Sequence, residues 1–395
     1  MTRDTLFSSH AAIKIALVAG EASGDLLGSH LIRALKARFP NAEFAGIGGP
    51  KMQSEGMNSV YPMETLAVNG YVEVLRNLRP ILRMRRELKA RLLAERPHVF
   101  IGVDAPDFNL GLERDLKSAG ITTIHYVSPS IWAWRGERIK KIKHCVSHML
   151  ALFPMEPALY EAEGIPVTYV GHPLADSFPL VPDREAMREQ LEITQDATVF
   201  ALLPGSRQSE VAALAETYIE TAKLLAEQMP QAQFLVPLVS RQTRDLFETT
   251  LYKLNAQDLP LRIMFGHARD AMVAADAVLV ASGTATLETA LMKRPMVIAY
   301  KVSPLTYRLM WNRKYLPYIG LPNVLAGEFV VPEILQGDAT PENLARTLIN
   351  IVDNRRLSDR LVSRFTDIHL QLRQNSAQRA ADAISRYLAG GRQAC

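Results

Sequence analysis

The sequence has little cysteine, little surplus charge and no long apolar run, and each shortage excludes a class of protein. Two cysteines, Cys145 and Cys395, are too few for a disulfide scaffold or a four-thiolate zinc site, and they favour a reducing compartment. The 45 basic residues against 41 acidic ones leave a formal charge of only +4, too small to bind nucleic acid through bulk charge. No stretch of about 18 or more apolar residues occurs, so neither a membrane span nor a secretory signal is expected. A soluble, intracellular protein of about two domains is the interpretation that fits 395 residues.

Motifs for several nucleotide and metal sites are also absent. The loop Gly20–Asp25 is not a Gly-x-Gly-x-x-Gly fingerprint, Gly46–Gly49 lacks the third glycine at the required offset, and no Walker-type run occurs. The chain has no Asp-x-Asp pair that could hold a divalent metal against a diphosphate. His144, Cys145 and His148 have the spacing of half a zinc site, but no complementary pair is visible. We therefore expect no metal and no cofactor, and disfavour a dehydrogenase or a P-loop protein.

What the sequence does contain is a repeated alternation of short apolar strands and amphipathic helices. Ile13–Ala19 is an apolar run that ends at a glycine turn, and the helical pattern Leu26–Phe39 follows it. Parallel strands with helical crossovers explain this alternation, which recurs along the chain. The further strands that we expect are Val99–Val103, Thr122–Val127, Val199–Leu203, Phe234–Val239, Arg262–Phe265, Ala277–Ala281 and Met296–Tyr300. The predicted fold class is α/β, with two doubly wound Rossmann-like domains facing a cleft.

The connection between the two sets of strands is rich in proline. Three prolines fall within Gly171–Arg184, which suits an extended link between domains. We predict an N-terminal domain over residues 1–178, a second domain over 179–375, and a C-terminal helix and tail over 376–395. The helical pattern Ala377–Leu388 is far from the second sheet in sequence and could pack back on the first domain. Ligands are expected at the carboxyl ends of the strands that line the cleft.

Two strand ends in the second half of the chain carry turns suited to phosphate. Pro204-Gly205-Ser206-Arg207 follows a strand and opens a helix, so its N–H groups, the helix dipole and a guanidinium can meet an anion. Ser282-Gly283-Thr284 follows another strand, and Glu288, one turn into the next helix, can accept hydrogen bonds from a ribose. Alternatively, Arg207 pairs with a surface carboxylate and Glu288 merely complements its helix dipole. Two such turns in one half of the chain favour a nucleotide site.

In the first half, a carboxylate stands where a strand ends. Asp104 follows the buried run Val99–Val103 and could act as a general base at the edge of the cleft. We assign Asp107 instead to capping the helix that follows. His125 and His172 also lie at or near strand ends. Each is either a ligand contact or a satisfied loop histidine, and the sequence does not decide between the two.

A basic and apolar segment spans residues 72–96. From Arg76 to Arg96 eight arginines and lysines face only two glutamates, Glu87 and Glu95, and apolar residues are interleaved with them in the first part. Such a mixture is typical of an interfacial segment for anionic lipid, and the alternative is a solvated helix with one core face. The membrane contacts that we expect are Val72, Leu75, Leu78, Arg79, Ile81 and Arg83.

Six motifs occur in order along the chain, namely Ala19–Asp25, Val103–Asn109, His125–Arg135, Leu203–Arg207, Ala281–Ala285 and Leu321–Asn323. They run from residue 19 to residue 323, and the stretch that ends Trp132-Ala133-Trp134-Arg135 is the longest and most specific of them. Together they closely resemble the motifs of the lipid-A-disaccharide synthase family, and the resemblance covers nearly the whole chain.

The resemblance implies a GT-B glycosyltransferase that inverts the anomeric centre and needs no cofactor. It would join UDP-2,3-diacylglucosamine to 2,3-diacylglucosamine 1-phosphate, giving lipid A disaccharide 1-phosphate and UDP, a step of lipopolysaccharide biosynthesis. The family works at the cytoplasmic face of the inner membrane of Gram-negative bacteria, so peripheral attachment to that surface is expected. A homodimer is compatible with the sequence, and no nucleic-acid partner is expected.

The strand-end pattern and the resemblance together suggest a role for each candidate residue. Asp104 would take the proton of the acceptor 6-hydroxyl, and Arg207 would neutralise the departing diphosphate in place of a metal. The expected donor residues are Gly205, Ser206, Arg207, Ser282, Gly283, Thr284, Glu288 and Asn323. The expected acceptor residues are Glu21, Ser23, Asp25 and His125.

Two other interpretations stay open. One is a different GT-B enzyme, such as a UDP-N-acetylglucosamine 2-epimerase or a transferase for another lipid acceptor. The other is a peripheral lipid- or nucleotide-binding protein without turnover, which would need no base at Asp104.

Overall fold

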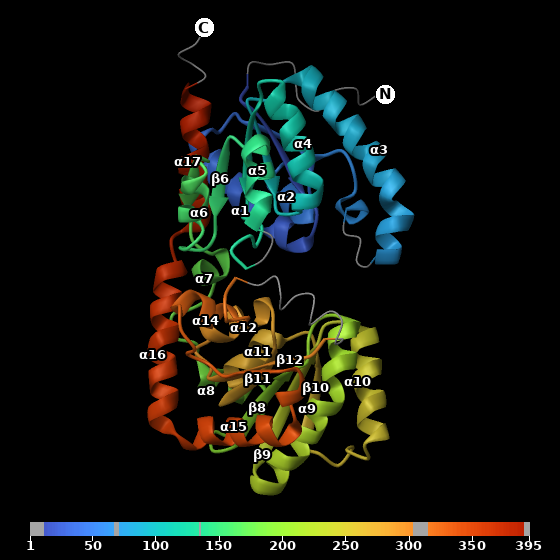
Figure 1. Ribbon diagram of the computed structural model, residues 1–395, viewed down its shortest axis with the longest axis vertical. Helices are drawn as coiled ribbons and strands as arrows, with labels where there is room; N and C mark the ends of the chain where they lie inside the picture. Colours follow the sequence, from blue (N-terminus) through green and yellow to red (C-terminus); the bar gives the residue numbers. More distant parts are fainter. Residues whose placement is uncertain (1–11, 67–70, 134–135, 303–314, 391–395) are drawn as a thin grey trace. The chain divides into compact units, whose positions relative to one another are not determined.

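Two compact units make up the computed structural model, which describes residues 12–66, 71–133, 136–302 and 315–390, with the side chains of all but 71–78 and 390. Unit 1 comprises the residues up to Asp176 together with those from Leu372 onward, and unit 2 comprises Ser177–Gln371 (Figure 1). The domain boundaries that we predict from the sequence lie after residues 178 and 375. The chain passes from unit 1 into unit 2 and returns to unit 1 at its C-terminal end.

Unit 1 is built on a parallel sheet of seven strands in the order β3-β2-β1-β4-β5-β6-β7. The strands are β1 (Lys14–Ala19), β2 (Glu43–Ile47), β3 (Asn58–Ser59), β4 (Val99–Val103), β5 (Thr122–Tyr126), β6 (His148–Ala151) and β7 (Val167–Tyr169). The α-helices are α1 (Ala22–Arg38), α2 (Pro50–Ser54), α3 (Tyr71–Glu95), α4 (Pro106–Ser118), α5 (Ile139–Cys145), α6 (Pro157–Ala162), α7 (Pro173–Ser177, which crosses into unit 2) and α17 (Ser376–Gly390). Two 3₁₀-helices, η1 (Met63–Thr65) and η2 (Gly136–Arg138), complete the described elements.

Helices cover both faces of this sheet, which is why its central strands are apolar on both sides. Successive side chains of a strand point to opposite faces. Ile15 and Leu17 of β1 lie in a core with α1, while Ala16 and Val18 lie in a second core with α3 and α4. Both sets are fully buried, as expected for a parallel sheet between helical layers.

Helix α17, from the far end of the chain, completes the first of these cores. Ile384 and Leu388 of α17 are buried in the same cluster as Leu31 of α1. Beside them, Arg38 Nη2 lies 2.6 Å from Asp382 Oδ1. Figure 1 shows α17 running along unit 1. The prediction that the C-terminal helix packs back on the first domain is confirmed.

Helix α1 begins at Ala22, whereas the sequence pattern suggests Leu26. The first residues of α1 are small, which lets them pack close to the ends of the strands. Small residues are also typical of a turn, so the sequence pattern there resembles one. A Cβ added to Gly24 would lie 3.4 Å from the Val103 carbonyl oxygen. Ser23 and Asp25 are therefore first-turn residues of a helix instead of loop residues.

Helix α4 begins at Pro106, with Ala105 in the N-cap position and no side-chain cap. Asp107 is exposed, and its Oδ1 accepts a hydrogen bond from Arg138 Nη2 at 3.2 Å. The prediction that Asp107 caps this helix is wrong, because the helix begins one residue before Asp107 and a cap must precede its first residue.

Unit 2 is built on a parallel sheet of six strands in the order β10-β9-β8-β11-β12-β13. The strands are β8 (Thr198–Leu203), β9 (Ala232–Leu238), β10 (Leu261–Phe265), β11 (Ala277–Ala281), β12 (Met296–Tyr300) and β13 (Glu333–Leu335). The helices are α8 (Arg184–Gln190), α9 (Gln208–Gln228), α10 (Arg241–Lys253), α11 (Ala268–Ala274), α12 (Thr284–Leu291), α14 (Leu321–Ala326), η3 (Gln336–Asp338), α15 (Pro341–Asp353) and α16 (Arg355–Leu372).

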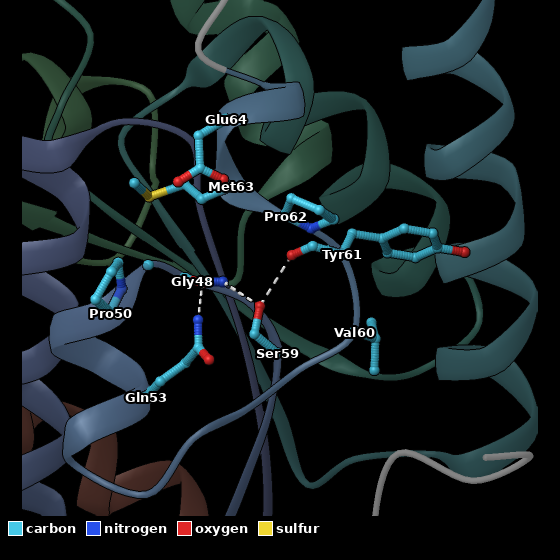
Figure 2. A pocket seen from close by; sticks show the side chains of 10 residues that line it. Gly48, Pro50, Gln53, Ser59, Val60, Tyr61, Pro62, Met63 and Glu64 are labelled. Carbon is cyan, nitrogen blue, oxygen red and sulfur yellow. Dashed lines mark hydrogen bonds between the residues drawn. The ribbon is translucent and has the colours of Figure 1, made fainter.

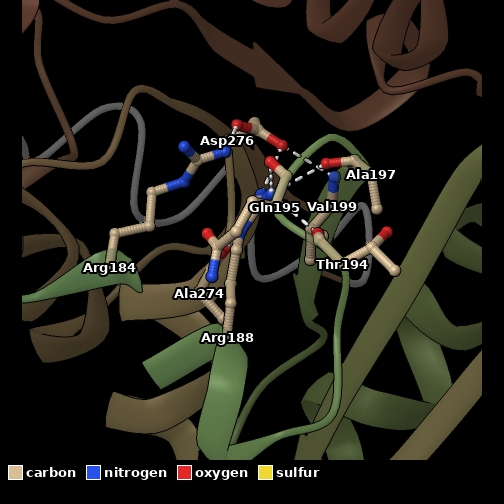
Figure 3. Close-up of polar contacts among 8 residues, drawn as sticks. All are labelled: Arg184, Arg188, Thr194, Gln195, Ala197, Val199, Ala274 and Asp276. Carbon is tan, nitrogen blue, oxygen red and sulfur yellow. Dashed lines mark hydrogen bonds and ion pairs between the residues drawn. The ribbon is translucent and has the colours of Figure 1, made fainter. Parts of the chain in front are cut away.

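A buried ion pair ties the amino ends of the unit 2 strands to α8 (Figure 3). The guanidinium of Arg188 is excluded from solvent, and its Nη2 lies 2.8 Å from Asp276 Oδ2. The rest of the guanidinium donates to carbonyl oxygens, including those of Ala274 and Ala197 at 2.9 Å. Asp276 also accepts the N–H of Val199 at 2.8 Å. The cluster holds the sheet at the end opposite to the predicted ligand site.

Candidate active site

Asp104 directly follows β4, at the carboxyl edge of the unit 1 sheet. Its backbone (φ 54°) and that of Ala105 (φ 44°) are left-handed, which costs a residue other than glycine about 1–2 kcal/mol. Val127, just after the neighbouring strand β5, is left-handed as well, at φ 85°. Strained backbone of this kind concentrates at functional sites, where the surrounding fold holds it. The side chain of Asp104 is half-buried, so a carboxylate on strained backbone stands at this edge.

Behind Asp104 lies a cluster of three fully buried polar residues, Asn109, Glu113 and His125. His125 Nδ1 and Glu113 Oε1 are 2.7 Å apart, and burial raises the pKa of the Glu113 carboxyl. Asn109 Nδ2 donates to the carbonyl oxygen of Asp104 at 2.8 Å. His125, expected beside the acceptor, thus lies inside unit 1. Glu113 could not be singled out from the sequence, because it looks like an ordinary polar residue of an amphipathic helix.

Two predicted acceptor residues follow the strand next to β4. Strand β1 pairs with β4, and Ala19 is in register with Val103. Glu21 and Ser23 come directly after β1 and are exposed. They therefore lie at the same edge of the sheet as Asp104, because parallel strands end on the same side.

Asp25, the third predicted residue of this turn, is buried. Its carboxylate accepts hydrogen bonds from the N–H groups of Lys51 at 3.0 Å and Met52 at 2.9 Å, at the start of α2. This is the electrostatic arrangement that stabilises a helix N-terminus. Both carboxylate oxygens are thus used within unit 1.

A cavity of about 340 Å³ lies at the carboxyl ends of β2 and β3 (Figure 2). Ser59 Oγ accepts the N–H of Gly48 at 3.1 Å and donates to the carbonyl oxygen of Tyr61 at 3.0 Å. Gln53 Nε2 donates to the Gly48 carbonyl oxygen at 3.3 Å. Proline and methionine side chains share the lining with amide, hydroxyl and carboxylate groups. The sequence pointed to these glycines only as an incomplete dinucleotide motif.

In unit 2, the turn at the start of α9 is already filled by a side chain. Glu210 Oε2 accepts the N–H groups of Ser206 at 3.0 Å and Arg207 at 3.2 Å. Glu210 Oε1 lies 3.3 Å from Arg207 Nη1, although the Arg207 side chain is 80% exposed. Gly205 is left-handed (φ 125°), and a Cβ there would lie 2.5 Å from Glu210 Cβ. The Glu210 carboxylate thus holds three of the donors that we expected to bind a diphosphate. This contact corresponds to the alternative interpretation, in which Arg207 pairs with a surface carboxylate.

The turn before α12 differs because no side chain caps it. Gly283 occupies the N-cap position with φ 152°, and a Cβ added there would meet no described atom within 4 Å. Helix α12 therefore presents its first-turn N–H groups and its positive dipole end beside open space. Ser282 Oγ donates to the Ile319 carbonyl oxygen at 3.4 Å, and Thr284 is exposed. Glu288 is partly buried one turn further on, and burial raises the pKa of its carboxyl.

Asn323 is fully buried in α14. Its Oδ1 accepts the N–H groups of Val330 at 2.8 Å and Val331 at 2.9 Å. Its Nδ2 donates to Glu333 Oε1 at 2.8 Å, and the same oxygen accepts the N–H of Gly320 at 2.8 Å. Asn323 thus fixes the segment that follows α14. Through Glu333, which holds the Gly320 N–H, it also supports the loop before α14, which is the loop that Ser282 contacts.

Two further histidines of unit 1, His148 and His172, are buried. His148 Nε2 lies 2.8 Å from Thr168 Oγ1, and its Nδ1 lies 3.0 Å from the hydroxyl of Tyr387 in α17. Burial lowers the pKa of both His148 and His172 to about 4, so both are neutral near pH 7. Within the described ranges, no three His, Cys, Asp or Glu residues are grouped so that they could hold a metal ion.

The basic and apolar segment forms most of helix α3. Arg79 and Arg83 are exposed, and Ile81 packs at the margin of the second core of unit 1. Three further predicted membrane contacts lie outside the residues whose side chains are described, namely Val72, Leu75 and Leu78. No helix in the described part of the chain is both long and apolar enough to cross a membrane.

Comparison with solved structures shows the fold. A putative UDP-N-acetylglucosamine 2-epimerase from Listeria monocytogenes is 12% identical, with 98% of each chain covered and a TM-score of 0.65. WaaG, a glycosyltransferase involved in lipopolysaccharide biosynthesis, is 14% identical, with 94% of this chain and 99% of that chain covered and a TM-score of 0.57. Two parallel Rossmann-like sheets of this kind are the GT-B fold, and the prediction of that fold is confirmed.

Comparison by sequence is more specific. The family described as Lipid-A-disaccharide synthetase matches residues 15–386. The Lipid-A-disaccharide synthase of Dechloromonas aromatica (strain RCB) is 60% identical over 375 residues, which are 95% of this chain and 98% of that protein. The epimerase interpretation, by contrast, has only the fold in its favour. With a family match over nearly its whole length and a relative of this identity, the chain belongs to the lipid-A-disaccharide synthase family, glycosyltransferases of lipid A biosynthesis.

Proposed function

We propose that the protein joins UDP-2,3-diacylglucosamine to 2,3-diacylglucosamine 1-phosphate, forming a β-1,6-linked disaccharide 1-phosphate and releasing UDP. Family membership supports the reaction. The observation that carries the mechanism is Asp104, a half-buried carboxylate on left-handed backbone at the carboxyl edge of a parallel sheet. In doubly wound folds, this edge is where ligands bind.

Asp104 accepts the proton of the acceptor 6-hydroxyl while that oxygen attacks the anomeric carbon of the donor. The bond from this carbon to the β-phosphate oxygen breaks as the new bond forms, so the anomeric configuration inverts and UDP leaves with the electron pair. A general base of this kind typically contributes about 10²–10⁴-fold to the rate. Glu21 and Ser23, exposed at the same sheet edge, contact the acceptor in this proposal.

Unit 2 holds the donor. A phosphate group suits the uncapped start of α12 at Ser282, Gly283 and Thr284, because N–H groups and the helix dipole attract an anion there. Glu288 accepts hydrogen bonds from the ribose. Asn323, whose amide is used within unit 2, supports the nucleoside through the loop before α14, which it holds by way of Glu333.

Arg207 neutralises the charge that develops on the leaving diphosphate. A guanidinium aimed at a leaving group acts most strongly in the transition state, where the negative charge has grown. Gly205 and Ser206 add backbone contacts to the same phosphates. These donors become available when the Glu210 carboxylate leaves them, so donor binding competes with an internal ion pair.

The protein attaches peripherally to the cytoplasmic face of the inner membrane through the first part of α3. Exposed Arg79 and Arg83 support this, because each cation near an anionic membrane contributes about 1 kcal/mol. Replacing Leu75, Leu78 and Ile81 with serine should weaken sedimentation with anionic vesicles and leave the protein folded, with a lower melting temperature because Ile81 packs against the core. Undiminished vesicle binding would assign these residues to an ordinary helix surface.

The reaction itself is tested by measuring UDP release from UDP-2,3-diacylglucosamine in detergent, with and without the acceptor and with EDTA throughout. Acceptor-dependent release is the expected result. Release without acceptor would indicate a hydrolase or an epimerase-like reaction. Binding of UDP without any release would indicate a different donor or a binding protein.

A further inference from the structure

The buried cluster behind Asp104 leaves an unusual number of polar atoms unsatisfied. Asn109 Oδ1, Glu113 Oε2 and His125 Nε2 are all buried, and none has a hydrogen-bond partner among the residues that the structure describes. Buried polar atoms are nearly always satisfied, because leaving one without a partner is unfavourable. Three such atoms on neighbouring elements therefore call for a role other than packing.

Strand β4 is shaped to admit this cluster. A Cβ added to Gly102 would lie 2.2 Å from Glu113 Oε1 and 2.9 Å from Asn109 Cβ. Any other residue at position 102 would push both side chains away from the strand. Asn109 and Glu113 are four residues apart on α4 and so share one face of the helix. They thus lie directly against the strand that ends in Asp104.

Asn109 joins this cluster to the backbone of Asp104. Its Nδ2 donates to the carbonyl oxygen of Asp104 at 2.8 Å and to that of Val18, in β1, at 3.2 Å. On the other side, the N–H of Asp104 donates to the carbonyl oxygen of Tyr126, in β5, at 2.8 Å. Both polar backbone groups of this left-handed residue are therefore held. The neighbour of Tyr126 in β5 is His125, which Glu113 fixes to α4.

We propose that Asn109 is a positioning residue that holds the Asp104 carboxylate in its working place, with the Glu113–His125 pair fixing helix α4 to β5. The inference rests on the proposed role of Asp104 as general base. Asn109 acts through the backbone of Asp104 and touches no reacting atom. Without its donation, Asp104 and Ala105 can leave the left-handed region, and the carboxylate moves with them. His125 then belongs to the support of the base and is not an acceptor contact.

The first test is the kinetics of Asn109→Ala. We expect kcat to fall about 10²-fold, the effect of misplacing a catalytic group by about 1 Å. The KM for each substrate should stay within about twofold, because no binding contact is removed. A merely structural role would lower the melting temperature without changing kcat of the folded protein.

His148→Gln is the matched control. His148 is also a buried histidine of the unit 1 sheet, but its partners are Thr168 and Tyr387 and it lies away from Asp104 along the sheet order. Its replacement should lower the melting temperature and leave kcat unchanged. If Asn109→Ala fails to fold, Asn109→Ser is measured instead. Serine fills more of the space than alanine does, but its side chain is too short to bridge the carbonyl oxygens of Asp104 and Val18.

The second test repeats the Asn109 substitution in an Asp104→Asn background. If Asn109 acts through the base, its loss should lower kcat no further there, so the two effects should not add. If the effects of the two substitutions on kcat add fully, the inference is overturned. It is also overturned if Asn109→Ala keeps the full kcat while Asp104→Asn loses it. Full activity in Asp104→Asn alone would overturn the assignment of the base, and the inference with it.

Discussion

Each unit buries a polar cluster against its sheet, and the two clusters differ in position and in completeness. Arg188 and Asp276 lie at the amino ends of unit 2 strands, and the guanidinium is bonded on every side (Figure 3). Asn109, Glu113 and His125 lie near the carboxyl ends of unit 1 strands, with three unsatisfied atoms and strained backbone beside them. The unit 2 cluster, in which one buried atom of the described residues, Arg184 Nε, has no partner, stabilises the fold. The less complete one in unit 1, we infer, holds a base at some expense of stability.

The sharpest test of this contrast is Asp104→Asn. We expect kcat to fall by about 10²–10⁴-fold, because the general base is lost. The free energy of unfolding should not decrease, since asparagine tolerates left-handed backbone and fits the same space. Rates of UDP formation and urea unfolding measure the two quantities. A loss of stability that matches the loss of rate would assign Asp104 to the fold.

Arg188→Ala should show the opposite pattern. Removing the guanidinium should cost about 1–3 kcal/mol of stability or more, because the buried carbonyl oxygens of Ala274 and Ala197 lose their donor. Asp276 is partly exposed and keeps its ion pair with Arg184. The kcat of the protein that stays folded should be unchanged. The control is Arg241→Ala, whose exposed side chain lies 3.8 Å from Asp245 and should contribute less than about 1 kcal/mol. A kcat loss in Arg188→Ala would break the contrast between the two sheet ends.

The pH dependence of stability tests the role of His148, a buried histidine of unit 1 that lies outside the cluster behind Asp104. Burial lowers the pKa of His148 from its ordinary value of 6.5 to about 4, so between these values only the unfolded chain binds the proton. The stability that the neutral imidazole contributes is complete above about pH 6.5 and is lost as the pH falls toward 4.

Comparison with His148→Gln isolates this effect, because the other titrating groups are common to both proteins. From pH 7 to pH 5 the parent should lose about 2 kcal/mol that the variant does not lose. Urea unfolding at the two pH values measures the difference. An equal loss in both proteins would show that His148 takes up its proton at the same pH in the folded chain as in the unfolded chain.

The smallest effect expected is in unit 2. Glu210→Gln removes the charge that occupies the start of α9, and UDP should bind about 2–5-fold more tightly, as expected for a charge near a helix terminus. Glu216→Gln, which removes an exposed charge further along the same helix, should leave the affinity unchanged. Weaker UDP binding by Glu210→Gln in calorimetry would mean that Glu210 shapes the turn for the ligand.

The fold could be predicted from the sequence because its signals are local. Apolar runs such as Ile13–Ala19 end at small residues, and the structure has a strand there, β1 (Lys14–Ala19). The apolar face of Ala377–Leu388 likewise needed a core, and it has one in unit 1. The start of α1 was missed because Ala22–Gly24 has the composition of a turn.

The site could be predicted only where a residue's place along a strand reveals it. Asp104 stands at a strand end, and the assignment of it as the base stays a prediction. The partners Glu113 and Glu210 could not be found, because each looks like a solvated residue of an amphipathic helix until the fold brings its partner near. The left-handed backbone at Asp104 and Ala105 could not be predicted either, because no glycine stands there to signal it. Contacts from other elements, such as the hydrogen bond from Asn109, hold this backbone in place.

The course of the chain also sets an order for folding on the ribosome. Unit 1 includes α17, whose residues are made roughly 200 positions after the rest of that unit. At typical synthesis rates this delay is about 10–40 s. During that time, helix α17 is missing from the face of the unit 1 core that Ile384 and Leu388 cover in the finished protein. The N-terminal half of this enzyme therefore matures last, and any chain truncated before α17 carries an open core.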